Sequence, residues 1–185
     1  MHAVRTPGID PTASIGDRSR VNRLARVGEF ARVGTGCDIR AGAVIGRNVL
    51  IGRNCVVREG ARLQESVLVE DAVTIEAEAV LASRVGDHLA GVTVRSGAVI
   101  GAGARCVGPA VIGRWAVVEP GAVVVSDVPD FAVVAGSPAA RVAWVGRAGV
   151  RLAALADGAF VCPQTGERYL ERDGRLALQE DAGRG

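Results

Sequence analysis

The sequence of 185 residues contains no lysine. All 22 of its Lys and Arg positions are arginine. Without lysine the chain cannot perform Schiff-base chemistry, hold a nucleotide on a P-loop lysine or use a lysine as a general base. Aromatic residues make up only 3% of the chain, which excludes a core built on aromatic packing. The net charge is only +2, so the chain lacks the charge excess typical of proteins that bind nucleic acid or anionic membranes.

Residues that bind metals are also scarce. The only histidines are His2 and His88, and the four cysteines form no C-x-x-C pair, so one chain cannot assemble a three-histidine or four-cysteine zinc site of familiar spacing. No hydrophobic run approaches the ~18 residues of a membrane span, and the N-terminus lacks the apolar region of a signal peptide. We therefore expect a cytoplasmic protein with free thiols and no bound metal, membrane or nucleic acid.

The chain does contain a repeat of six residues. The first position of the repeat is a branched aliphatic residue in 18 of 19 cases and cysteine in the other. These residues are Ile9, Ile15, Val21, Val27, Val33, Ile39, Ile45, Ile51, Val57, Leu63, Val69, Ile75, Leu81, Val94, Ile100, Cys106, Ile112, Val118 and Val124. Four residues further on, all nineteen positions hold alanine, serine, cysteine or valine, from Ala13 to Val128.

A period of six fits neither a helix, which repeats every ~3.6 residues, nor a single strand, which repeats every ~2. It indicates a chain that turns a corner every six residues, so that three short strands make one coil. The large residue fills the interior and the small one lets the corner close. Glycine at the second position, as in Gly16, Gly34 and Gly52, predicts a tight or left-handed backbone there. The predicted fold class is an all-β parallel β-helix.

Residues eighteen apart lie above one another in such a coil. Three surface ion pairs are therefore predicted: Arg47 with Glu65, Arg53 with Asp71 and Arg58 with Glu76. Cys37 and Cys55 are also eighteen apart, at inward positions, and are interpreted as two buried apolar thiols rather than a redox pair.

The repeat is interrupted once. Leu81 and Val94 are thirteen residues apart, one more than two repeats, so a loop break is predicted at residues 83–93. Loops on rigid scaffolds often carry the chemistry. His88 is the sole histidine of the repeat region, and an imidazole can accept a proton at neutral pH. We predict His88, or a water held by Ser83 and Asp87, as the general base; a solvated loop histidine is the alternative.

After Val128 the sequence resembles a known family. The D-V-P segment at 127–129, followed by the G-S-P-A turn at 136–139, is similar to the terminal signature of the hexapeptide-repeat acyltransferases, which lies near the coenzyme A adenylate. From Asp10-Pro11-Thr12-Ala13 to Arg141-Val142-Ala143-Trp144-Val145, the chain resembles the N-acetyltransferases of nucleotide-linked amino sugars. This resemblance implies a left-handed β-helix, a homotrimer with sites between adjacent subunits, and coenzyme A in the groove between two prisms.

The resemblance also implies site residues. Val94-Arg95-Ser96-Gly97-Ala98 is similar to the family's V-K-R-G-A, on the coils beside coenzyme A. Contacts to acetyl-CoA or another acyl-CoA are expected from Arg95, Gly101, Arg114, Gly136, Ser137 and Arg141, although each arginine can also be a plain surface residue.

The acceptor side departs from the family. Asn22-Arg23-Leu24 stands where relatives have W-H-F, and Arg58-Glu59-Gly60 stands where they have an asparagine-rich sugar-binding stretch. The long loop of relatives is here a short bulge. We therefore expect Arg23 and Glu59 at a rebuilt acceptor pocket, unless that pocket has been lost.

The domain organisation follows from the repeat. Residues 1–130 are predicted to form the β-helix, and residues 131–185 an extension that packs on it or on a neighbouring subunit. The run 168–178 predicts a hairpin on an Asp173-Gly174 turn. Relatives often end in a zinc ribbon, but only Cys162 of the four ligands remains, so no metal is expected.

The leading hypothesis is a CoA-dependent acyltransferase, expected to be an N-acetyltransferase, acting on an amine or hydroxyl of a nucleotide-sugar or sugar-derived acceptor. Two alternatives stay open because the family's histidine, asparagines and loop are missing. One is a non-catalytic trimeric scaffold or ligand-binding relative. The other is a β-helix enzyme with a different reaction in secondary metabolism.

Overall fold

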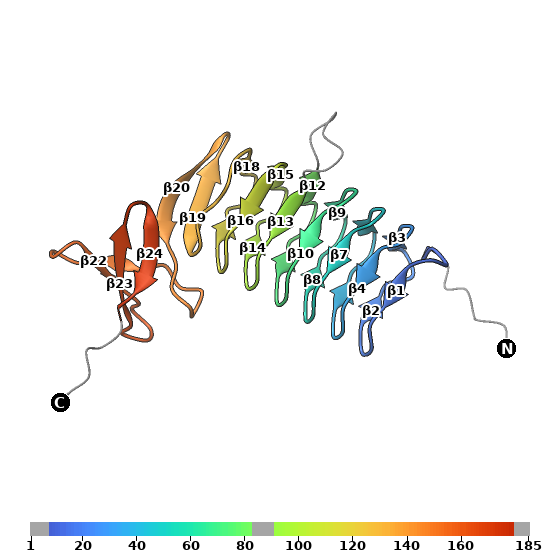
Figure 1. Cartoon of the computed structure of the whole chain (residues 1–185), viewed down its shortest axis with the longest axis horizontal. Coiled ribbons are helices and arrows are strands. Elements are labelled where there is room, and N and C mark those ends of the chain that lie inside the picture. The colour runs from blue at the N-terminus through green and yellow to red at the C-terminus, as the bar shows by residue number, and fades with distance from the viewer. Residues whose placement is uncertain (1–7, 83–90, 180–185) are drawn as a thin grey trace.

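The structure is a computed structural model that describes residues 8–82 and 91–179. Most of it is a three-sided prism whose sides the chain visits in turn (Figure 1). Sheet I contains β1 (Ser14–Ile15), β4 (Arg32–Val33), β7 (Leu50–Ile51), β10 (Leu68–Val69), β13 (Val92–Val94) and β16 (Ala110–Ile112). Sheet II contains β2 (Arg20–Val21), β5 (Asp38–Ile39), β8 (Val56–Val57), β11 (Thr74–Ile75), β14 (Val99–Ile100), β17 (Val117–Val118), β19 (Ala132–Gly136) and β20 (Ala139–Trp144). Sheet III contains β3 (Arg26–Val27), β6 (Val44–Ile45), β9 (Arg62–Leu63), β12 (Val80–Ala82), β15 (Arg105–Val107) and β18 (Val123–Val124).

Apart from the final strand β20, the strands within each side of the prism are parallel, and most neighbours are eighteen residues apart, as in the pairs Ser14 with Arg32 and Leu50 with Leu68. The predicted all-β parallel β-helix is thus confirmed. Among the described residues the structure contains no helix that is long and apolar enough to cross a membrane.

The core follows the two inward positions of the repeat. From Val27 to Val124, every residue at the first position exposes at most 4% of its surface, and the described small residues four positions later, from Ala25 to Ala79 and from Ala98 to Ala122, are buried as well. No polar or charged residue of the described chain is buried. Burial of each large aliphatic side chain contributes roughly 1.5–3 kcal/mol, so the first position of the repeat supplies a large favourable contribution to folding of the prism.

The repeat is interrupted between β12 and β13, but the predicted bounds of the break, residues 83–93, extend too far, because Val92 and Thr93 belong to strand β13. Leu68 of β10 pairs with Thr93 of β13, 25 residues further on rather than eighteen. The seven additional residues fall between β12 and β13. On either side of them the pairing is regular, since β12 pairs with β15 in sheet III and β13 pairs with β16 in sheet I. The coil therefore continues in register on both sides of the interruption.

The corner between sheets I and II, called the I–II corner here, shows why the second position of the repeat is often glycine. An added Cβ at Gly34 would lie 2.6 Å from the carbonyl carbon of Gly52 on the next coil, and one at Gly16 would lie 2.6 Å from that of Gly34. Neither residue has a positive φ. The left-handed position comes two residues later, at Gly36 and Arg18. The prediction of left-handed backbone at the second position was therefore wrong, and lack of space for a side chain explains these glycines.

Two of the three predicted ion pairs are present. Arg53 Nη2 lies 3.0 Å from Asp71 Oδ2, and Arg58 Nε lies 2.9 Å from Glu76 Oε2. Arg47 instead makes an ion pair with Glu29, eighteen residues earlier, at 3.7 Å. The arginine at this corner therefore reaches back to the preceding coil.

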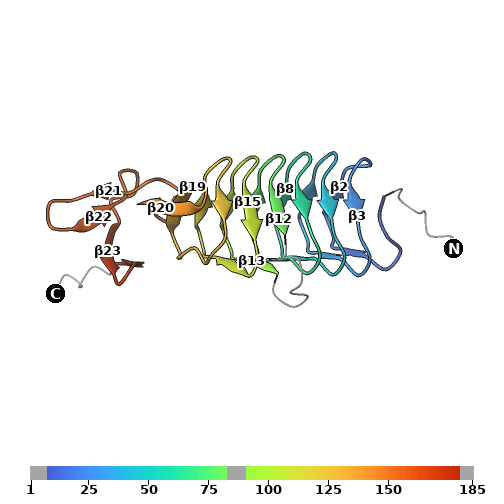
Figure 2. The same cartoon turned by 90° about the horizontal axis from the view of Figure 1, so that it is seen from above.

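The prism ends in a strand reversal followed by a small sheet. β19 pairs in parallel with β17, and β20 returns antiparallel to β19. An antiparallel sheet of β21 (Ala153–Ala154), β22 (Ala159–Val161), β23 (Arg168–Arg172) and β24 (Arg175–Leu178) follows, and Figure 2 shows it beyond the end of the prism, away from the N-terminus. The predicted hairpin is confirmed, with φ of 50° at Asp173 and 70° at Gly174. The domain boundary at residue 130 stays a prediction.

Candidate functional site

Two hollows adjoin on the outer face of sheet I, over β13 and β16. The first has a volume of about 540 Å³ and is lined by Arg95, Val111, Gly113, Arg114, Asp127, Val128, Pro129, Asp130, Asp173, Gly174, Arg175 and Leu176. The second has a volume of about 570 Å³ and is lined by Ser66, Gly91, Thr93, Pro109, Ala110, Val111 and Asp127. Because Val111 and Asp127 line both hollows, they form one groove across the sheet, which we call the sheet I groove.

One end of the sheet I groove is basic. Arg95 and Arg114 occupy successive coils at the I–II corner. Arg114 is held in place by Asp130, whose carboxylate accepts the backbone N–H at 2.7 Å and the Nε–H at 3.0 Å. No acidic side chain of the described residues forms an ion pair with Arg95, whose guanidinium can therefore bind an anion.

The other end of the groove lies at the base of the loop break. Gly91, the first described residue after the break, lines this end, whereas Asp127, which accepts the backbone N–H of Val111 at 2.8 Å, lies where the two hollows meet. The predicted catalytic residues Ser83, Asp87 and His88 lie outside the described residues, and their roles stay predictions.

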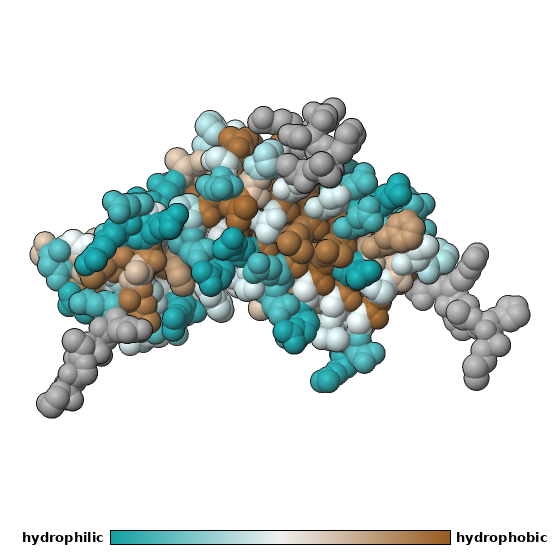
Figure 3. Space-filling view, viewed as in Figure 1, coloured by the Kyte–Doolittle hydropathy of each residue, from teal (hydrophilic) through white to brown (hydrophobic). Residues whose placement is uncertain are grey.

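An apolar strip runs along sheet I towards the N-terminus. Figure 3 shows it in the middle of the face that Figure 1 presents to the viewer. Leu50 and Leu68 expose 43% and 38% of their surface there, and both line a third hollow of about 400 Å³. Exposed large apolar side chains beside a groove are typical of a surface that a ligand or a partner covers.

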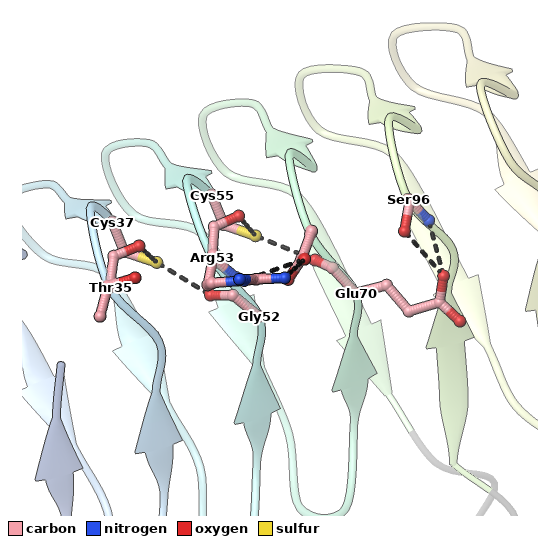
Figure 4. Close-up of polar contacts among 8 residues, drawn as sticks. Thr35, Cys37, Gly52, Arg53, Cys55, Glu70 and Ser96 are labelled. Atoms are coloured by element: carbon pink, nitrogen blue, oxygen red, sulfur yellow. Dashed lines mark hydrogen bonds and ion pairs between the residues drawn. The ribbon is translucent and has the colours of Figure 1, made fainter.

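The same third hollow contains a carboxylate that the sequence analysis missed. Glu70 Oε2 accepts hydrogen bonds from both the backbone N–H and the hydroxyl of Ser96, each at 2.9 Å (Figure 4). A signal was present in the sequence, because Glu70 and Arg95 replace the glycine found at the same corner position in Gly16, Gly34, Gly52 and Gly113. Glu70 is half-buried and Arg95 is exposed, and each lines a hollow on the surface of the prism.

Asp71, next to Glu70, has a structural role. Its carboxylate accepts hydrogen bonds from the backbone and the guanidinium of Arg53, and these bonds hold the pKa of Asp71 below its ordinary value. A carboxyl whose pKa is lowered by folding stabilises the fold above its unfolded-state pKa, and the effect is lost as the pH falls through the folded-state pKa. This contact therefore supports the corner at neutral pH and weakens only in acid.

The inward cysteines of this corner are buried, as predicted. Cys37 donates to the carbonyl of Gly52 at 3.1 Å and Cys55 to that of Glu70 at 3.0 Å (Figure 4). Contact with Cys37, together with burial, raises the pKa of the Cys55 thiol. Burial raises the pKa of Cys106 to about 12. Thiols with raised pKa values are poor nucleophiles, so neither Cys55 nor Cys106 suits catalysis.

Several predicted site residues lie away from the groove. Arg23, Glu59 and Gly101 lie at the corner between sheets II and III, and Gly136 and Ser137 form the turn between β19 and β20. An added Cβ at Gly101 would lie 2.5 Å from the backbone nitrogen of Pro120, so close stacking of the coils explains this glycine. The binding roles of these residues stay predictions.

Arg141 contacts the C-terminal sheet instead of the groove. Its Nη2 lies 2.9 Å from Glu171 Oε1, and its guanidinium lies 4.3 Å from the ring centroid of Trp144. Glu171 Oε2 also accepts the indole N–H of the buried Trp144 at 2.8 Å. Glu171 therefore joins the small sheet to the end of the prism.

Replacing Glu171 with Ala is expected to destabilise the protein by about 2 kcal/mol, because the buried indole N–H loses its acceptor. In a chain of this size the melting temperature should fall by about 6 °C in a thermal unfolding scan. Glu171→Gln is the matched control, since it keeps an acceptor oxygen and should lose less. Equal melting temperatures for wild type and Glu171→Ala would contradict the assigned role.

Among residues 8–82 and 91–179, no group of three or more His, Cys, Asp or Glu side chains is placed so that it could hold a metal ion. Cys162, at the predicted position of a family zinc ligand, is buried in the C-terminal sheet.

Comparisons with known proteins point to one class of enzyme. No protein-family model matches the chain. A dTDP-3-amino-3,6-dideoxy-alpha-D-galactopyranose 3-N-acetyltransferase from Aneurinibacillus thermoaerophilus is 40% identical over 81 residues, which are 44% of this chain and 41% of that protein. The chain thus matches less than half the length of this curated relative.

Solved structures share the fold. The N-acyltransferase AntD from Bacillus cereus, in complex with dTDP and 3-hydroxybutyryl-CoA, matches with a TM-score of 0.65 and 17% identity, over 73% of this chain and 84% of AntD. A mutant of AntD, in complex with dTDP and coenzyme A, matches with a TM-score of 0.66 and 16% identity, over 73% and 85% of the two chains. The curated relative confirms the predicted resemblance to nucleotide-sugar N-acetyltransferases, and the solved structures share the β-helical fold.

Proposed function

We propose that this chain is a CoA-dependent N-acyltransferase that acetylates the amino group of a nucleotide-linked or sugar-derived acceptor. The observation that carries the proposal is the 40% identity over 81 residues to a 3-N-acetyltransferase of a dTDP-linked amino sugar. The volume of the sheet I groove supports it, because each of the two hollows falls in the ~300–1,000 Å³ range typical of ligand pockets.

The active unit in this proposal is a homotrimer with the sheet I groove at the contact between adjacent prisms. The exposed Leu50 and Leu68 beside the groove support such a contact, since a second subunit would remove their apolar surface from water. Residues at the corner between sheets II and III, such as Arg23 and Glu59, then contribute to a site only across the subunit contact.

The basic end of the groove is proposed to bind the phosphates of the acyl-CoA. A guanidinium presents several N–H donors in a plane, which suits a phosphate group better than a single ammonium does. Arg95 has no ion-pair partner among the described residues and is the first candidate. Arg114 is partly neutralised by Asp130 and contributes a more fixed group.

The chemical step takes place near the loop break in this proposal. The acceptor amine attacks the thioester carbonyl, a C–N bond forms, and the C–S bond breaks to release the coenzyme A thiolate. His88, or a water held by Ser83 and Asp87, removes the proton of the amine, and backbone N–H groups of a coil stabilise the oxyanion. The thiolate takes up a proton to complete the reaction.

Calorimetric titration of the purified protein with acetyl-CoA and CoA tests the proposal. We expect micromolar binding, and we expect Arg95→Ala to weaken it by about tenfold, because one charge-assisted contact to phosphate is lost. Arg105→Ala is a matched control, since Arg105 is an exposed arginine of sheet III outside the groove. No binding at millimolar ligand would contradict acyl transfer and favour the non-catalytic scaffold.

A further inference from the structure

The C-terminal hairpin forms one wall of the sheet I groove. Asp173, Gly174, Arg175 and Leu176 line the first hollow opposite residues of the prism that include Arg95. These four residues come from the end of the chain, about eighty residues after Arg95, in a part that the repeat does not include. The groove is therefore completed by a structure separate from the coils.

The hairpin is held firmly in this place. Tyr169 of β23 is fully buried, and Leu176 of β24 exposes only 7% of its surface. Tyr169 donates its hydroxyl to Glu167 at 2.9 Å and accepts the backbone N–H of Arg147 at 3.1 Å. Arg151 on the approach to the small sheet also makes an ion pair with Glu119 of the prism. The turn is thus presented to the groove by buried contacts.

The charges of the groove leave two arginines available. Three carboxylates line the first hollow. That of Asp130 is engaged by Arg114, and that of Asp127 accepts the backbone N–H of Val111 where the two hollows meet. Asp173 lies beside Arg175 in the turn and makes no ion pair with a described residue. Arg95 and Arg175 likewise have no acidic partner in the described parts of the chain, and both are exposed.

We propose that Arg175 of the C-terminal hairpin and Arg95 of the prism together bind a phosphate group, so that the hairpin is part of the ligand site. This inference rests on the proposed function, in which both substrates carry phosphates. The phosphate can belong to coenzyme A or to the nucleotide of the acceptor, and the two sources have the same chemistry towards a guanidinium.

The experiment measures binding of CoA, dephospho-CoA and dTDP to the full chain by calorimetry. Arg175→Ala should weaken at least one of these ligands by about tenfold. Arg172→Ala is the matched control, because Arg172 faces Arg175 across the hairpin and carries the same charge but does not line the groove. It should bind all three ligands as the wild type does.

The ligand that is affected identifies the source of the phosphate. A loss for CoA but not for dephospho-CoA assigns Arg175 to the 3′-phosphate, an equal loss for both assigns it to the diphosphate, and a loss for dTDP assigns it to the nucleotide of the acceptor. All three results support the inference. Wild-type affinity of Arg175→Ala, or the same loss in Arg172→Ala, would overturn it while leaving the proposed function intact. Failure of the wild type to bind any of the three would overturn both.

Discussion

Replacing His88 with Asn should lower the turnover number by about 10²- to 10⁴-fold, the contribution typical of a positioned general base. The amine of the acceptor must lose a proton as it attacks the thioester, and asparagine can hydrogen-bond but cannot accept that proton. His88 lies in the segment that interrupts the repeat, three residues before Gly91 in the sequence, and Gly91 lines the sheet I groove. The measurement is a steady-state assay of acetyl transfer to a dTDP-linked amino sugar.

The binding of acetyl-CoA provides the control for His88→Asn. Its dissociation constant should stay within about twofold of the wild-type value, because a proton acceptor is needed only in the transition state. The acidic limb of the pH–rate profile should also disappear with the imidazole. Unchanged turnover in His88→Asn would remove this residue from the mechanism, and Asp87→Asn would then test the alternative of a water held by Ser83 and Asp87.

Replacing Gly34 with Ala should destabilise the prism by about 3 kcal/mol, at the upper end of the effects of overpacking. The new Cβ would lie 2.6 Å from the carbonyl carbon of Gly52, and backbone atoms of a neighbouring coil cannot move aside without breaking the strand pairs on either side. In a chain of this size the melting temperature should fall by about 10 °C. Thermal or denaturant unfolding followed by circular dichroism measures the change.

Gly103→Ala is the matched control for the clash. Gly103 lies at another corner with a φ of 65°, and nothing lies within 4 Å of an added Cβ. Its replacement should cost only the roughly 1–2 kcal/mol of placing alanine in the left-handed region. If Gly34→Ala were no less stable than Gly103→Ala, stacking distance would not be the reason for glycine at the second position of the repeat.

Much of the fold could be predicted because its cause is local and repeated. A large aliphatic residue such as Ile75 recurs every six residues, and a small one such as Ala79 follows four positions later. Each coil is therefore packed in the same way as the coil before it. The ion pairs Arg53–Asp71 and Arg58–Glu76 follow from the same spacing. Arg47 pairs with Glu29 on the preceding coil instead of Glu65 on the following one. An arginine can reach the coil on either side, and only the packing around it decides which of the two it contacts.

The candidate site was less predictable. Arg95 and Arg114 were identified through a resemblance, and the structure brings both to the sheet I groove. Glu70 was missed although it interrupts a column of glycines, because a single sequence does not show that the column belongs to one corner of the prism. Arg175 was missed because its hairpin has its own local pattern, which says nothing about where the turn lies on the prism.

The amino-acid sequence by itself determined the β-helix, the position of its interruption and the hairpin at its end, because each depends on side-chain size and turn chemistry within a few residues. Only the tertiary structure decided which outward residues share a groove. The repeat spacing indicates which outward residues lie on adjacent coils, as for Arg53 and Asp71, but it does not indicate where the C-terminal hairpin, which lies outside the repeat, meets the prism. That Arg95 and Arg175 line the same hollow depends on contacts such as that of Glu171 with Trp144, which attach the last sheet to the end of the prism.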